Sequence, residues 1–328
     1  MSDREPLVSV VTPVHNGAEF LRECIESVLA QTYRNYEYLI VNNCSTDESR
    51  SIAMEYAVRD ARIRVLDTET LLPQVRNHNE ALRRIAPESR YCKIIQADDW
   101  MFPACLREMV ALAERYPTIG IVGSYRLRGR EIGGQGLPYQ ETFLKGRELC
   151  RRQLLGGLFL FGSPSSTLVR SDIVRKRVPF YVEGGVHVDT EAYYEIMLEH
   201  DFGFVHQLLS FARTDNASIS SHARQLFPEG LDKWICVRKY GRLVLDEAEY
   251  ARCLKQVEAY YFSELGDRVL WGAGRRLVDY HRKGLATIGE SFWSARLMKH
   301  IAWAALDAVG NPKKTIGRLC RPQGHRNG

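Results

Sequence analysis

The chain has 328 residues, of which 45% are hydrophobic and 26% are charged. These proportions are ordinary for a soluble globular protein, and the length allows one large α/β domain with a substantial extension. The formal net charge is +5, and residues 311–328 carry five basic side chains and no acidic one. The rest of the chain is therefore close to neutral, which argues against a basic nucleic-acid-binding body.

The cysteines and the apolar runs bear on the cellular compartment in which the protein is expected. Eight cysteines are scattered along the chain, and no two of them form a C-x-x-C pair, so neither a zinc knuckle nor a redox motif is indicated. The first six residues have no apolar run of the kind that a signal peptide needs, and no later run approaches the roughly 20 residues that span a bilayer. We expect a reduced, cytoplasmic protein.

Apolar runs alternate with helical periodicities through the first part of the chain. Buried strands are expected at residues 7–12, 36–41, 63–66, 91–96 and 119–124, and helices at 18–31, 45–59, 74–85 and 103–116. Ser45 and Glu48 fit a capping box that opens the second helix. This alternation predicts an α/β fold with a Rossmann-like, mostly parallel sheet flanked by helices.

The later chain changes character twice. After residue 126 the pattern loosens and glycine becomes frequent, with strands expected at 165–170 and 204–213 and a helix at 189–200. After about residue 226 only amphipathic helices are expected. We therefore predict three parts: an α/β domain at 1–225, a helical region at 226–310 and a basic tail at 311–328.

Ligands bind outside the carboxyl ends of the strands in such sheets, so the polar residues that follow strands are candidates for a site. Asp98 and Asp99 end an apolar strand, and two adjacent carboxylates are costly to hold together without a cation. A hard divalent ion shared with a diphosphate would satisfy them. The alternative is that an aspartate here only caps the following helix.

Three ordered blocks carry a resemblance to a known family. The segment LVSVVTPVHNGAEFLRECIESVLAQTYRNYEYLIVNNCSTDES is followed by VRNHNEALRR and then by IIQADDW. In order and spacing these blocks resemble the family 2 glycosyltransferases of the GT-A fold. The resemblance is continuous over residues 7–124 and continues more weakly to about residue 220 through GSPSSTLVR, HVDTEAYYE and FARTDNASIS.

The resemblance implies a donor site for a nucleotide sugar. Pro13 and His15 would line the base, Asn43 would hydrogen-bond its edge, and Arg76 would lie near the base or the phosphates. A UDP-sugar is the donor that the family suggests first. However, the family's acidic pair before the STD sequence is here Asn42-Asn43, and an amide both donates and accepts, so another base is an open alternative.

The resemblance also implies the metal and the catalytic base. Asp98 and Asp99 would be the metal-motif aspartates that hold Mn²⁺ or Mg²⁺ under the diphosphate, with Asp98 or its neighbour also contacting the ribose. Asp189 would be the catalytic base of an inverting enzyme, and the alternative is that it only caps its helix. Glu191 is the reserve candidate for the base. The first aspartate of the D-x-D form is here Gln96.

Several further residues have two interpretations each. His187 and His222 are either additional metal ligands or polar surface residues. Residues 162–166 form either an acceptor-side loop or an ordinary turn. The tail and the C-terminal tryptophans and arginines either contact a membrane face or a lipid-linked acceptor, or belong to a frayed terminus and a packed core. These C-terminal side chains are Trp234, Trp271, Trp293, Trp303, Arg275 and Arg276.

The sequence thus predicts a metal-dependent glycosyltransferase of the hexosyltransferase type. It would move a sugar with inversion from a nucleotide sugar to a glycan or lipid-linked acceptor, in bacterial surface polysaccharide biosynthesis. One alternative is a nucleotidyltransferase, which should carry a glycine- and lysine-rich loop after the first strand, where this chain has TPVHNGAEF. The other is a non-catalytic member of the same fold that binds a nucleotide or a partner.

Overall fold

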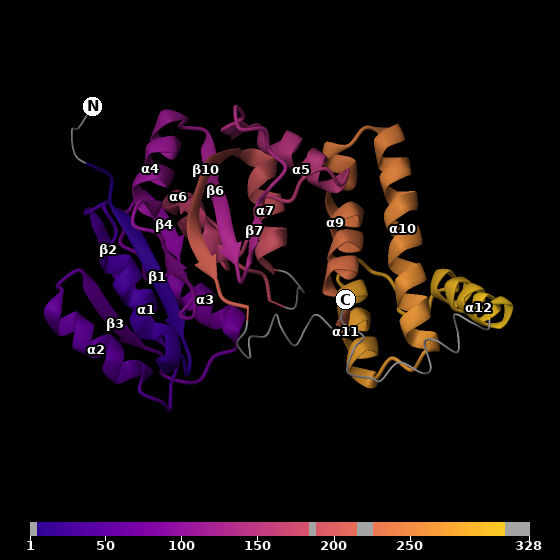
Figure 1. Ribbon diagram of the computed structural model, residues 1–328, viewed down its shortest axis with the longest axis horizontal. Helices are drawn as coiled ribbons and strands as arrows, with labels where there is room; N and C mark the ends of the chain where they lie inside the picture. Colours follow the sequence, from indigo (N-terminus) through magenta and orange to yellow (C-terminus); the bar gives the residue numbers. More distant parts are fainter. Residues whose placement is uncertain (1–4, 184–187, 215–225, 312–328) are drawn as a thin grey trace. The chain divides into compact units, whose positions relative to one another are not determined.

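The computed structural model describes residues 5–183, 188–214 and 226–311. The chain forms two compact units, residues 1–221 and 222–328 (Figure 1). The three parts predicted above stay a prediction, and most of the predicted tail lies outside the described residues. Each unit is taken by itself below.

The first unit is built on one sheet that contains ten strands of the described residues. The path runs β3-β2-β1-β4-β9-β6-β10-β5, with β7 beside β6 and β8 beside β10. The bounds are β1 Val8–Val14, β2 Tyr36–Asn42, β3 Ile63–Asp67, β4 Tyr91–Ile94, β5 Trp100–Met101, β6 Ile119–Arg128, β7 Glu131–Gly133, β8 Phe143–Leu144, β9 Thr167–Arg170 and β10 Asp201–Ala212.

The central strands run parallel, as the sequence predicts. β1 pairs in parallel with β2 on one side and with β4 on the other, and β3 is parallel to β2. β6 and β10 form a second parallel pair. Between the two parallel groups β9 runs antiparallel to both β4 and β6. The carboxyl ends of β1, β2 and β4 therefore open on the same edge of the sheet.

Helices flank the sheet of the first unit (Figure 1). They are α1 Ala18–Leu29, α2 Ser49–Arg59, α3 Gln74–Leu82, α4 Cys105–Arg115, α5 Gly146–Leu154, α6 Ser171–Lys176 and α7 Val188–Glu199, with a 3₁₀ turn η1 at Pro164–Ser166. The apolar face that the sequence assigns to α1 is buried in the main core, through Leu21, Cys24, Ile25 and Val28. The predicted α/β fold with a mostly parallel sheet is confirmed.

One local prediction is wrong. Ser45 and Glu48 do not form a capping box, because Glu48 is the N-cap of α2 and makes no side-chain cap hydrogen bond. The Ser45 hydroxyl instead accepts a hydrogen bond from the Asn16 backbone nitrogen, 3.0 Å away in the loop after β1. Asp47 takes over the local role, since its Oδ1 accepts from the Ser49 backbone nitrogen at 2.9 Å. A contact between loops has replaced the local cap.

The second unit is helical in the described residues. Its helices are α9 Pro228–Val244, α10 Glu247–Leu270, α11 Arg275–Ala286 and α12 Ala295–Gly310. Trp234 of α9 is fully buried and stacks on Tyr261 of α10, whereas Trp293 and Trp303 are 59% and 63% exposed. The predicted tryptophan set therefore divides between core packing and surface. Among the described helices none is long and apolar enough to cross a membrane.

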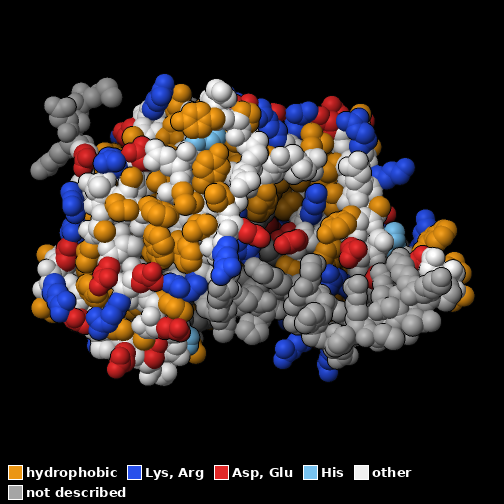
Figure 2. Space-filling model, in the orientation of Figure 1, with side chains coloured by type: hydrophobic (Ala, Val, Ile, Leu, Met, Phe, Trp, Pro, Cys, Tyr) orange, Lys and Arg blue, Asp and Glu red, His pale blue; other side chains and the backbone are white. Residues whose placement is uncertain are grey.

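Charge and thiol chemistry agree with the composition. On the face in Figure 2, Lys and Arg side chains are interspersed with Asp and Glu side chains over the sheet unit. Of the seven described cysteines six are buried and only Cys44 is partly exposed. Burial raises the pKa of the Cys24 and Cys92 thiols to about 12, so these groups behave as small apolar side chains.

Candidate active site

The loops after β1 and β2 are held together by a dense set of hydrogen bonds. The Asn16 residue adopts φ 50°, and its Oδ1 accepts from the Thr46 backbone nitrogen at 2.8 Å. The Gly17 nitrogen donates to Ser49 Oγ at 2.9 Å, and the Asn43 nitrogen donates to the Val14 carbonyl at 2.8 Å. The two strand ends that the sequence assigns to the nucleotide base therefore form one continuous surface.

His15 is exposed on this surface and its orientation is fixed. Its Nδ1 lies 2.8 Å from the Asn43 carbonyl oxygen, which can only accept, so Nδ1 carries the proton. In the neutral ring Nε2 is then an acceptor. Pro13, which the sequence places beside the base, is buried in β1. The predicted base contacts of both residues stay predictions.

Asn43 is 2% exposed, and its side chain holds the chain segment after β3. Nδ2 donates to the Leu72 carbonyl at 2.8 Å, and Oδ1 accepts from the Leu72 nitrogen at 2.8 Å and from Thr68 Oγ1 at 3.1 Å. The amide therefore fixes residues 68–72 against the end of β2. Its predicted hydrogen bond to a nucleobase edge stays a prediction.

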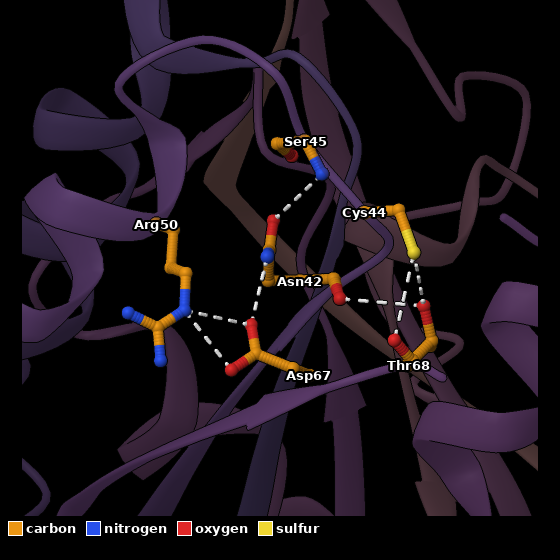
Figure 3. Close-up of polar contacts among 6 residues, drawn as sticks. All are labelled: Asn42, Cys44, Ser45, Arg50, Asp67 and Thr68. Carbon is orange, nitrogen blue, oxygen red and sulfur yellow. Dashed lines mark hydrogen bonds and ion pairs between the residues drawn. The ribbon is translucent and has the colours of Figure 1, made fainter. Parts of the chain in front are cut away.

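Asn42 explains one departure from the family pattern. Its Nδ2 donates to Asp67 Oδ1 at 2.8 Å, and its Oδ1 accepts from the Ser45 nitrogen at 3.3 Å (Figure 3). Arg50 donates to both oxygens of Asp67, at 3.1 and 3.0 Å. The Asn42 hydrogen bond, opposed by partial burial, and then Arg50 hold the pKa of Asp67 below its usual range. An acidic residue at position 42 would face the Asp67 carboxylate, so the amide is the compatible choice.

Arg76 lies on α3 and forms a two-pronged ion pair with Glu183, since its Nε is 2.9 and 2.8 Å from the two carboxylate oxygens. The pair is exposed, and residues 184–187, which follow Glu183, lie outside the described residues. The predicted role of Arg76 at the base or phosphates stays a prediction.

Asp99 is 5% exposed and its carboxylate is engaged on both oxygens. Ser165 Oγ donates to Oδ2 at 2.5 Å, and the Arg213 backbone nitrogen donates to Oδ1 at 3.0 Å. Burial and then the charge of Asp98 raise the pKa of Asp99 to about 7, against these two hydrogen bonds. Asp98 is less buried than Asp99, so it presents the more accessible carboxylate.

Lys93 and Arg213, which the sequence did not single out, complete this centre together with Ser165 of the predicted 162–166 loop. Lys93 is fully buried in β4, and its Nζ donates to the Ser165 and Thr167 carbonyls at 2.5 and 3.1 Å. Ser165 also accepts from the Gln96 backbone nitrogen at 3.1 Å. Arg213 donates from Nε to the Asp98 carbonyl at 3.2 Å and covers the Phe20 ring at 4.1 Å. The signal available in the sequence was Lys93 itself, a charged residue inside an otherwise apolar strand.

The donor set at Asp98 and Asp99 fits a divalent cation only if a ligand supplies more oxygens. Within the described residues no group of three His, Cys, Asp or Glu side chains could hold a metal ion. Mg²⁺ is commonly held by one or two carboxylates plus substrate phosphates, which is the set that Asp98 and Asp99 offer. The raised pKa of Asp99 fits this, because a nearby cation would stabilise the paired carboxylates.

Asp189 lies in the first turn of α7, and its Oδ1 accepts from the Thr190 nitrogen at 2.9 Å. Its charge reaches His78 of α3, where it raises a pKa that burial lowers. His78 Nδ1 lies 2.8 Å from the Gln74 carbonyl and Nε2 lies 3.2 Å from the Gln96 amide. The Gln96 atom that faces Nε2 is the side-chain oxygen Oε1.

Two sequence predictions cannot be placed. His187 and His222 lie outside the described residues. Glu191, the reserve base, lies in the first turn of α7 with Asp189. Residues 164–166 of the predicted acceptor loop form η1, and Ser165 connects that loop to Asp99.

The comparisons with known proteins agree with the fold. The family model described as glycosyl transferase family 2 matches residues 9–178, which is more than half of the chain, so the chain belongs to this family. A candidate teichuronic acid biosynthesis glycosyltransferase, TuaG of Bacillus subtilis strain 168, is 32% identical over 124 residues. That match covers 38% of this chain and 48% of TuaG, so the chain spans about half the length of this relative.

Solved structures share the fold at low identity. The S. aureus TarS 1-349 complex with UDP-GlcNAc superposes with a TM-score of 0.62 and 16% identity, over 86% of this chain and 80% of that one. The mannosyltransferase PcManGT from Pyrobaculum calidifontis, in complex with GDP-Man and Mn²⁺, gives a TM-score of 0.53 and 16% identity over 95% and 83% of the two chains. The fold is therefore of the GT-A glycosyltransferase type.

Proposed function

We propose that this glycosyltransferase moves a sugar with inversion from a nucleotide-sugar donor, a UDP-sugar first, to a glycan or lipid-linked acceptor of a bacterial surface polysaccharide. The observation that carries the proposal is the hydrogen bond from Ser165 to Asp99, because it joins the end of β4 to η1. η1 contacts β6, and α7, which carries Asp189, contacts the same strand. The polysaccharide assignment takes its support from TuaG.

In the proposed mechanism Asp189 takes the proton of the acceptor hydroxyl as the oxygen attacks the anomeric carbon. The new C–O bond forms as the bond from the anomeric carbon to the nucleoside diphosphate breaks, which inverts the configuration. A divalent cation held by Asp98, with Asp99 behind it, would supply positive charge for the departing diphosphate. His15 and the loops at the ends of β1 and β2 would orient the nucleotide.

The test of this mechanism is Asp189→Asn. The amide keeps the shape and can still accept from the Thr190 nitrogen, so the cap is retained while the base is lost. Transfer with the preferred donor should fall by at least about 100-fold, the usual share of general base catalysis, with nucleotide affinity unchanged. Glu191→Gln is the matched control. Equal turnover of Asp189→Asn and the parent would show that Asp189 has only the capping role.

A non-catalytic nucleotide- or partner-binding protein is the second candidate function. Two observations favour it. Gln96 stands where the family motif has an aspartate, and the side-chain oxygen of Asn43 is already occupied by hydrogen bonds from Leu72 and Thr68. Asp98→Asn separates the two candidates when measured for both transfer and nucleotide binding. Transfer that is present in the parent and lost in the variant supports the enzyme, whereas a parent that binds a nucleotide but transfers no sugar from it supports the binding module.

The cytoplasmic location with peripheral membrane contact is also a proposal, and the surface of α12 supports it. Met298, Trp303, Leu306 and Val309 fall on one side of the helix and are 52%, 63%, 64% and 82% exposed. The tail sequence that follows is basic, and such a combination binds anionic lipid surfaces. Sedimentation with phosphatidylglycerol vesicles should deplete the full chain from solution, and Trp303→Glu should weaken this; phosphatidylcholine vesicles are the control.

A further inference from the structure

Arg126 is a largely desolvated cation without a partner in the described residues. It lies on β6, and its Nη1 is closed off from solvent with no hydrogen-bond acceptor. Its side chain makes no ion pair with any described residue either. Other arginines of the first unit, such as Arg62 and Arg213, have a carboxylate partner. A buried charge without a partner destabilises the folded protein, and a bound anion would remove that cost.

Two glycines make the room that the guanidinium occupies. A Cβ on Gly133 of β7, which stands opposite Arg126 in the strand register, would lie 2.9 Å from its Cζ. A Cβ on Gly162, just before η1, would lie 2.7 Å from its Nη1. The backbone of both segments thus approaches the guanidinium as closely as glycine alone permits.

Hydroxyl groups without partners accompany the cation. Ser163, next to Gly162, has a buried Oγ with no hydrogen-bond partner among the described residues. Ser210 of β10 pairs with Arg126 in the strand register, and its buried Oγ also has none. Buried polar groups are normally satisfied, so an unsatisfied guanidinium with unsatisfied hydroxyls on the paired strand and beside Gly162 indicates an absent polar ligand.

The charges around Arg126 select the sign of that ligand. Burial, and then the charge of Arg128, lower the pKa of Arg126, while the charge of Asp189 raises it and Tyr193 adds a smaller effect in the same direction. Asp189 lies close enough to act on Arg126 without pairing with it. A guanidinium whose Nη1 has no acceptor among the described residues binds a carboxylate or a phosphate best, through paired hydrogen bonds.

The position in the sheet assigns the ligand to one substrate. Arg126 is on β6, which β9 separates from β4 and its Asp98-Asp99 end, and the base-binding loops of β1 and β2 lie further along the same order. Its neighbours are instead the η1 loop and Asp189. A group bound here belongs to the molecule whose hydroxyl Asp189 would deprotonate, so this step depends on the proposed function.

We propose that Arg126, with the Ser163 hydroxyl, forms an anion subsite that binds a carboxylate or phosphate of the acceptor beside Asp189. The enzyme would then select acidic acceptors, such as a uronic acid residue or a sugar phosphate, over neutral glycans. The Ser163 hydroxyl donates to the same anion, and the absence of a side chain at Gly162 leaves room for the guanidinium beside η1.

Calorimetric titration of the full chain with glucuronic acid, glycerol 1-phosphate and neutral glucose, with and without UDP and Mn²⁺, tests the subsite. Both acids should bind at least about 10-fold more tightly than glucose, since a charge-assisted pair is lost with the neutral sugar. Arg126→Gln should remove this preference and leave UDP affinity unchanged. Arg128→Gln, an exposed arginine two residues along the same strand, is the matched control and should keep the preference.

The contrary outcomes are distinct. Equal binding of glucose and the two acids to the parent would overturn the subsite. A 10-fold loss of UDP affinity in Arg126→Gln would place the anion on the donor diphosphate and overturn the assignment to the acceptor. If UDP does not bind the parent at all, the proposed donor site fails, while the comparison of acids with glucose without UDP still decides the subsite.

Thermal unfolding of Arg126→Met separates a binding role from a structural role, because the two roles predict opposite shifts of the unfolding midpoint. Removing an unpaired buried cation should raise the unfolding midpoint of the ligand-free protein, because the desolvation penalty disappears. Glycerol 1-phosphate should raise the midpoint of the parent and not that of the variant. A midpoint several degrees below that of the parent would show that Arg126 holds the fold together, and the proposal would be abandoned.

Discussion

Replacement of Ser165 by alanine should destabilise the sheet unit through one lost hydroxyl. Ser165 is 1% exposed, and its Oγ serves the Asp99 carboxylate at 2.5 Å and the Gln96 backbone nitrogen at 3.1 Å. Alanine leaves one buried carboxylate oxygen and one backbone N–H without their partner. A hydrogen bond to a charged group is worth about 1.5–3 kcal/mol and an unsatisfied buried group costs about 1–3 kcal/mol. The sum is about 3–4 kcal/mol after partial relaxation.

Such a loss should lower the unfolding midpoint of the unit by roughly 6–16 °C, measured by scanning calorimetry in EDTA. Ser166→Ala is the matched control, because Ser166 is equally buried but its Oγ donates only to the nearby Ser163 carbonyl at 2.9 Å. That variant should lose about 1 kcal/mol. Equal midpoints for the two variants would refute the reasoning that Ser165 couples the η1 loop to Asp99.

Two further predictions concern Asn42 and His281. Asn42→Asp should lower the free energy of unfolding by about 2 kcal/mol at pH 7, because it sets a second carboxylate against Asp67. Urea denaturation measures this loss, and Asn35→Asp, at an exposed position, is the control. Equal losses in the two variants would contradict the prediction. His281 is fully buried, donates to the Leu226 carbonyl at 2.8 Å, and has its pKa lowered from 6.5 to about 4 by burial. The unfolded chain therefore takes up a proton first, so stability is full above pH 6.5 and falls by on the order of 3 kcal/mol toward pH 4. His281→Gln should remove that part of the pH dependence in tryptophan-monitored urea unfolding, whereas His206→Gln should keep it.

The strands and the site's location were predictable because they depend on local pattern. Short apolar runs rich in β-branched residues, such as Val8–Val14 and Tyr36–Asn42, favour buried strands, and parallel strands bring their polar ends to one edge. The position of the Asp98-Asp99 pair at the end of β4 follows from the same rule. The predicted ends of elements were less accurate, as with the helix expected from Pro103 that begins at Cys105.

The connections within the site were not predictable, because they join residues distant in sequence. Ser165 reaches Asp99 across 66 positions and Asn43 reaches Leu72 across 29. The failed capping box has the same origin, since Ser45 bonds to Asn16 of another loop. The lack of partners around Arg126 is also invisible in the sequence, where an arginine in a strand reads as a solvated side chain. The sequence pattern therefore predicts where polar side chains lie, whereas their hydrogen-bond partners depend on the fold.

The most direct test of the central claim is calorimetric titration of the full chain with UDP, GDP, dTDP and CDP, each with and without Mn²⁺. We expect one nucleotide, UDP first, to bind with Mn²⁺ and to bind at least about 10-fold more weakly without it, because Asp98 and the diphosphate would share the cation. The same dependence on Mn²⁺ should disappear in Asp98→Asn. Absence of binding by all four nucleotides under both conditions would contradict a donor site at the ends of β1, β2 and β4.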